Sequence, residues 1–108
     1  MAIFHWKLQR ISAILLIPIA IYTTFYLFNI GSLSYADVTN DISSIPAILL
    51  IVFMSVILFM HSSLGIETIL EDYIHDMKTQ SLLVNLSKFI HVILFLLTLV
   101  SLIVIKGN

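Results

Sequence analysis

The sequence predicts an all-α membrane protein with three transmembrane helices, and two observations carry this prediction. Hydrophobic residues make up 60% of the 108 residues and charged residues only 10%, against about 25% charged in an ordinary soluble domain. The apolar residues also fall into three long runs, each close to the roughly 20 residues that a helix needs to cross a bilayer. A soluble chain of this length could not bury so much apolar surface, so residues 1–108 are predicted to form one membrane domain.

The three runs define the expected spans. The first lies at about residues 10–30 and contains Pro18, which should bend the helix because proline lacks a backbone N–H. The second lies at about residues 45–71 and opens with Pro46, a residue that the first turn of a helix tolerates. The third lies at about residues 82–105.

The lysines and arginines predict the orientation, because basic residues gather on the inner side of membrane proteins. The first loop, Gly31–Ser44, has no basic residue, and the C-terminus has only Lys106. The N-terminus and the second loop, Glu71–Ser81, are therefore expected to face the cytoplasm or matrix, with the C-terminus on the opposite side. The basic residues that flank this inner side are Lys7, Arg10, Lys78 and Lys88.

Charge and cysteine content exclude several kinds of chemistry. The net charge of −1 argues against a nucleic-acid partner. Without cysteine, the chain carries no disulfide, thiolate ligand or iron–sulfur cluster, so any cluster chemistry belongs to another subunit. The N-terminus lacks the pattern of a signal peptide, and we expect insertion as it stands, from a bacterial cytoplasm or from inside an organelle.

One stretch of the second span carries most of the residues that are capable of chemistry. Gly65, Thr68 and Asp72 follow His61 at intervals of 4, 7 and 11 residues, which bring all four onto one helix face. Asp72 then lies about 16 Å along the axis from His61. This arrangement suits a helix that holds a flat prosthetic group at depth and a polar ligand near the surface. The alternative is a membrane helix with a single histidine and ordinary polar residues at its exit.

Two histidines, His61 and His91, lie inside the spans, where ionisable residues are rare. An imidazole ligates haem iron through one ring nitrogen when its other N–H finds an acceptor. The acceptors near His61 are Ser62, Ser63 and backbone carbonyls. A haem held between both histidines is conceivable, but helices packed about 8–10 Å apart leave little room for it. For His91 we favour a hydrogen bond within the bundle.

Three further residues are expected together at the inner interface. Arg10 would bind haem propionates or a polar ligand through its planar donors, or it would extend to lipid phosphates, which we favour from the residues alone. The hydroxyl of Tyr73 would donate to a quinone carbonyl, with Asp72 beside it to tune or relay protons. The competing account is an interfacial tyrosine next to a solvated aspartate.

These residues resemble a known family. His5-Trp6-x-x-x-Arg10 followed by Ile-Ser-Ala-Ile-Leu-Leu is similar to the start of the smaller hydrophobic membrane-anchor subunit of succinate dehydrogenase (respiratory complex II). His61-x-x-x-Gly65 followed by Glu71-Asp72-Tyr73-Ile74 resembles the second helix of that smaller anchor and its exit. The two motifs fall in the expected order, and their form resembles the mitochondrial and alphaproteobacterial branch.

The resemblance implies a role in succinate:ubiquinone oxidoreduction, in which the isolated chain has no activity. It implies that His61 ligates the iron of a haem b, the second ligand coming from the larger cytochrome b anchor of the complex. It places Tyr73 and Asp72 at the ubiquinone site and Arg10 near the haem propionates or that site. It also implies a flavoprotein and an iron–sulfur subunit on the inner face, with the chain in a mitochondrial or bacterial inner membrane.

Three other functions stay open. A fumarate-reducing relative would have the same architecture with electron flow reversed. A haem-free assembly subunit would use His61 for packing alone. A small channel or transporter subunit would show more polar residues along its spans.

Overall fold

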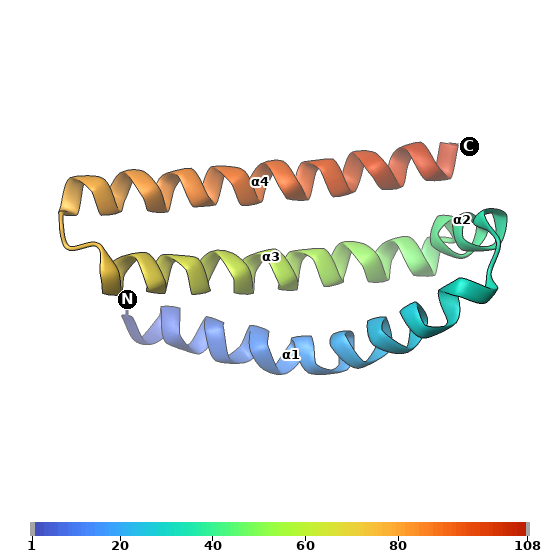
Figure 1. Ribbon diagram of the computed structural model, residues 1–108, viewed down its shortest axis with the longest axis horizontal. Coiled ribbons are helices and arrows are strands. Elements are labelled where there is room, and N and C mark those ends of the chain that lie inside the picture. The colour runs from blue at the N-terminus through green and yellow to red at the C-terminus, as the bar shows by residue number, and fades with distance from the viewer. Residues whose placement is uncertain (1, 108) are drawn as a thin grey trace.

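The computed structural model describes residues 2–107, which are helical apart from short connections (Figure 1). Three helices are long and apolar enough to cross a membrane, which confirms the predicted fold class and makes the protein an integral membrane protein. The elements in chain order are α1 (Ala2–Asn29), the short 3-10 helix η1 (Ile30–Ser32), α2 (Tyr35–Ser43), α3 (Ile45–Tyr73) and α4 (Met77–Gly107).

Helix α3 lies between α1 and α4 and runs antiparallel to both (Figure 1). The N-terminus and the α3–α4 connection therefore lie at one end of the bundle, which we call the turn end. The short helix α2 and the C-terminus lie at the other, which we call the α2 end. Helix α1 continues through Pro18 without interruption and follows a curved path, so the predicted bend takes the form of a curve.

The helices extend beyond the spans that hydrophobicity predicts. Helix α1 already begins at Ala2 and α4 at Met77, so the second connection is only residues 74–76. The segment expected to be the first loop, Gly31–Ser44, contains the helix α2. Its N-terminus forms a capping box, in which Ser34 and Asp37 each accept a hydrogen bond from the other's backbone N–H. Hydrophobicity marks the membrane-crossing part of a helix, whereas caps and connections decide where the helix ends.

Side chains also cap the N-termini of α3 and α4. The hydroxyl of Ser44 accepts a hydrogen bond from the backbone N–H of Ala47 at the start of α3. At the start of α4, the Asp76 carboxylate accepts hydrogen bonds from the hydroxyl and the backbone N–H of Thr79. These hydrogen bonds hold the pKa of the exposed Asp76 carboxyl below its usual value, with the hydroxyl making the larger contribution.

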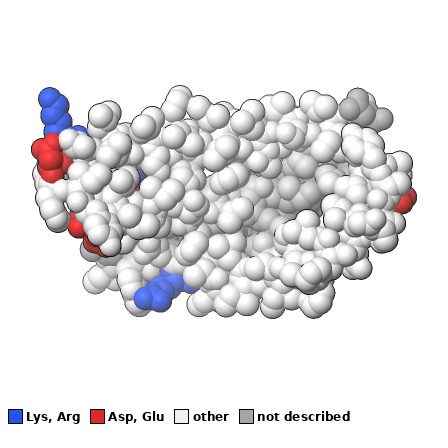
Figure 2. Space-filling view, in the orientation of Figure 1, with Lys and Arg blue, Asp and Glu red and all other residues white. Residues whose placement is uncertain are grey.

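Few side chains are buried inside this chain. Most large apolar side chains are exposed on the helices, as expected for surfaces that contact lipid or another membrane subunit. On the face seen in Figure 2, charged residues gather mainly toward the turn end, and a broad middle band carries no charge. The buried residues in the described part of the chain are Ser12, Ser55, Ile57, Val84 and Leu102.

Candidate functional site

Side chains from α1, α3 and α4 meet in the half of the bundle nearer the turn end. We call this group the polar layer. It joins α1 to α3 and α3 to α4 through hydrogen bonds and ion pairs. Its members are His5, Gln9 and Ser12 from α1, His61, Ser62, Glu67 and Thr68 from α3, and Lys88 and His91 from α4, together with the backbone carbonyl of Leu64 in α3.

His61 is half-buried at the α1–α3 contact, and one of its ring nitrogens is engaged. Its Nδ1 lies 2.9 Å from the hydroxyl of Ser12, a side chain with 0% exposure. Among residues 2–107, its Nε2 makes no hydrogen bond. The sequence indicated Ser62, Ser63 and backbone carbonyls as nearby acceptors, whereas the hydrogen-bond partner of Nδ1 is Ser12 on the neighbouring helix. The order of residues along α3 does not reveal this partner.

Both ring nitrogens of His91 are engaged. Nδ1 lies 2.7 Å from the backbone carbonyl of Ser87, and Nε2 lies 3.0 Å from the hydroxyl of Ser62. A carbonyl only accepts, so Nδ1 carries the proton and Nε2 accepts from Ser62. This confirms that His91 is hydrogen-bonded within the bundle, and it leaves His91 without a free nitrogen for a metal.

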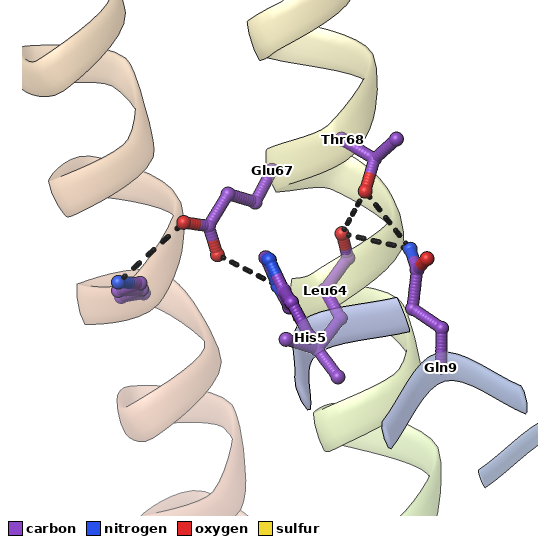
Figure 3. Close-up of polar contacts among 6 residues, drawn as sticks. His5, Gln9, Leu64, Glu67 and Thr68 are labelled. Atoms are coloured by element: carbon purple, nitrogen blue, oxygen red, sulfur yellow. Dashed lines mark hydrogen bonds and ion pairs between the residues drawn. The ribbon is translucent and has the colours of Figure 1, made fainter. Parts of the chain in front are cut away.

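Gln9 forms a second link between α1 and α3 (Figure 3). Its amide nitrogen donates to the hydroxyl of Thr68 at 2.9 Å and to the carbonyl of Leu64 at 3.2 Å. The Thr68 hydroxyl itself donates to the Leu64 carbonyl at 3.0 Å. The three groups form a closed, part-buried network between the two helices.

Glu67 lies between basic groups on the two neighbouring helices. One carboxylate oxygen is 3.4 Å from Nε2 of His5 and the other is 3.9 Å from the ammonium of Lys88. The His5 nitrogen is buried and does not have the geometry of a hydrogen bond to Glu67, so the two attract each other by charge when His5 is protonated. The side chain of Glu67 is only 18% exposed, and Lys88 supplies its permanent counter-charge.

Glu71 completes a group of three potential metal ligands with His5 and Glu67. Their ligand atoms lie within 4.8 Å of one another. Glu71 is exposed, and Glu67 is already paired with Lys88. We therefore assign no metal to this group.

Arg10, Asp72 and Tyr73 all lie in the turn-end half of the bundle, and all three are exposed. The Arg10 guanidinium carbon is 5.3 Å from the ring centroid of Trp6, a cation–π contact. Within residues 2–107, no hydrogen bond or ion pair connects Arg10 to Asp72 or Tyr73. Their grouping around a common ligand stays a prediction.

Sequence reasoning missed the α1 part of the polar layer, although a signal for it was present. On α1, Gln9 lies 4 residues after His5 and Ser12 lies 7 residues after it. This spacing places the three on one face of the helix. The same intervals had singled out the face of α3 that carries His61. Reading both helices in this way pairs their polar faces.

Comparisons with known proteins place the chain in a family of transmembrane subunits. Residues 1–105 match the family described as succinate dehydrogenase/fumarate reductase transmembrane subunit. A succinate dehydrogenase membrane anchor subunit of Reclinomonas americana is 42% identical over 79 residues. That alignment covers 70% of this chain and 66% of the relative, slightly less than two thirds of its length. No solved structure matches this chain.

Proposed function

This chain belongs to the family of succinate dehydrogenase/fumarate reductase transmembrane subunits, and on that premise we propose that it anchors a succinate:ubiquinone oxidoreductase in the membrane. It would contribute one axial ligand to a haem b and part of the ubiquinone-reducing site. Its partners would be a larger cytochrome b anchor subunit, an iron–sulfur subunit and a flavoprotein subunit. The chain alone would have no activity, because the redox chemistry belongs to the cofactors.

The observation that carries the haem assignment is the difference between the two histidines. His61 has one hydrogen-bonded ring nitrogen and one that makes no hydrogen bond within residues 2–107, which fits an axial ligand whose other N–H is held by an acceptor. His91 uses both nitrogens inside the bundle. His61 would therefore hold the iron from this chain, and the second ligand would come from the partner anchor. When bound, haem b supplies one-electron redox chemistry.

The quinone part of the proposal is supported by the exposure of Tyr73. Its side chain is 79% exposed at the last residue of α3, so the hydroxyl is free to donate to a ligand held against this chain. A phenol donor stabilises the negative charge that develops on a quinone oxygen during reduction. Asp72 lies next to it as a group able to exchange protons with water, and Arg10 would add positive charge nearby.

Purification of the complex through a tag on this chain tests the proposal. We expect the three partner subunits to copurify, the preparation to show a reducible b-type absorbance, and succinate to drive ubiquinone reduction. A chain that purifies without the flavoprotein and iron–sulfur subunits would contradict the anchoring role. A preparation that reduces fumarate with a low-potential quinol faster than it reduces ubiquinone with succinate would favour the fumarate-reducing direction.

A further inference from the structure

We propose that Ser12 is a positioning residue that selects the tautomer of His61 and leaves its Nε2 ready to bind iron. This inference rests on the proposed haem ligation by His61. It goes beyond that proposal by assigning the group that prepares the ligand and by placing that group on another helix.

The hydrogen bonds around Ser12 support this tautomer of His61. Its hydroxyl is 3.0 Å from the backbone carbonyl of Gln9, to which it donates, and 2.9 Å from Nδ1 of His61. A hydroxyl has one proton, and the carbonyl can only accept. With that proton directed at Gln9, the Ser12 oxygen accepts a hydrogen bond from Nδ1–H. A neutral imidazole protonated at Nδ1 has its lone pair at Nε2, as a metal ligand requires.

Burial makes Ser12 an effective acceptor. Its side chain has 0% exposure, so water does not replace it easily, and its hydrogen bond to His61 joins α1 to α3. An imidazole that donates through Nδ1 becomes a more basic ligand at Nε2. A more basic ligand stabilises the ferric state relative to the ferrous state, which lowers the reduction potential of the iron.

The hydrogen bonds of His91 provide a comparison with those of His61. Its Nδ1 also donates, in this case to the carbonyl of Ser87, but the hydroxyl of Ser62 occupies Nε2. The two rings therefore share a tautomer and differ in what meets the lone pair. At His61 a serine hydroxyl contacts Nδ1 and leaves Nε2 open, whereas at His91 a serine hydroxyl contacts Nε2.

The test compares Ser12→Ala with Ser55→Ala in the intact, purified complex. Ser55 is also buried, at 8% exposure, but its hydroxyl bonds the Ile51 carbonyl of its own helix. The measurements are the haem midpoint potential from an optical redox titration, the low-spin ferric signal by electron paramagnetic resonance, and the haem retained after dilution. Ser12→Ala should raise the potential, shift the ferric signal and weaken haem retention about 10- to 100-fold. Ser55→Ala should leave all three unchanged.

The results have distinct consequences. A Ser12→Ala complex with unchanged potential, signal and haem content overturns the positioning role, and so does a lowered potential. Ser12→Thr keeps a hydroxyl and should hold the wild-type potential; a shift equal to that of Ser12→Ala would assign the effect to packing and also overturn the proposal. The variant His61→Ala distinguishes failure of the proposed haem ligation from failure of the role of Ser12. If it leaves the haem spectrum intact, the proposed ligation fails. If it removes the spectrum while Ser12→Ala changes nothing, only the role of Ser12 fails.

Discussion

The two halves of this bundle are held together differently. Toward the turn end, the polar layer connects α3 to both of its neighbours through side chains. Toward the α2 end, the side-chain hydrogen bond between separate helices in the described residues is one surface contact, from the ammonium of Lys106 to the backbone carbonyl of Ser43. There, an apolar hollow of about 500 Å³ opens between α1 and α3 beside Leu16, Ala20 and Leu58.

The difference shows that the polar layer is not needed merely to join the helices. Polar groups inside a membrane are costly, and interhelical hydrogen bonds there contribute only about 0.6 kcal/mol on average. The α2 end associates mainly through apolar contacts, with the hydrogen bond from Lys106 to Ser43 at its surface. The proposed haem and quinone sites would account for the concentration of imidazoles, a carboxylate and hydroxyls in the half nearer the turn end.

The largest expected effect is an all-or-none difference in thiol labelling between the two ends of the bundle, which reports the end that faces inward. The native chain has no cysteine, so Asn40→Cys in α2 and His75→Cys in the turn would each be the one thiol of this chain, and both positions are exposed. A membrane-impermeant thiol reagent added from outside should label position 40 and spare position 75 until detergent and chaotrope open the complex. Labelling of position 75 alone would reverse the orientation and remove the turn end from the inner face.

The next largest effect is expected at Tyr73. Tyr73→Phe keeps the ring and removes the hydroxyl, and the loss of one hydrogen bond to the developing charge costs about 1–3 kcal/mol, or roughly 10- to 100-fold in quinone reduction. Succinate oxidation by an artificial acceptor at the flavin should continue, because that reaction does not reach the membrane.

A matched control is available at the opposite end of the bundle. Tyr35 is 85% exposed at the start of α2, so Tyr35→Phe should leave both activities unchanged. Equal quinone reduction in the Tyr73 and Tyr35 variants would make Tyr73 an ordinary interfacial residue. Loss of both activities in Tyr73→Phe would show a defect in assembly and would not bear on the site assignment.

The smallest effect is expected for stability. Gln9→Leu removes the donor that bridges α1 to Thr68 and Leu64, at a cost of about 1–2 kcal/mol. Ser101→Ala removes a hydroxyl bonded to its own helix and should cost less than about 0.5 kcal/mol. Thermal dissociation of the complex, followed by haem absorbance, compares the two. Equal midpoints for the variants would show that the polar layer adds no stability beyond apolar packing.

The architecture could be predicted from the sequence because a bilayer imposes a length on every apolar run. Three spans and their order follow from that rule, whereas α2 does not, because its nine residues depend on the Ser34 capping box and not on hydrophobicity. The early start of α4 at Met77 has the same explanation, since the Asp76–Thr79 contact supports its first turn.

Only the part of the candidate site that lies along a single helix was predicted from the sequence. The periodicity of α3 pointed to His61, but the Ser12 hydroxyl that meets its ring lies 49 positions earlier in the chain. Contacts of this kind depend on how two helices pack, which neither helix encodes by itself. The same holds for Glu67, whose basic neighbours are His5 on α1 and Lys88 on α4.

The most direct test of the account is the reduced-minus-oxidised absorption spectrum of the complex with His61→Ala and with His91→Ala. We predict that His61→Ala loses or alters the b-type band while flavin-level succinate oxidation persists, and that His91→Ala keeps the band. An unchanged band in His61→Ala, or a band lost only in His91→Ala, would contradict the account.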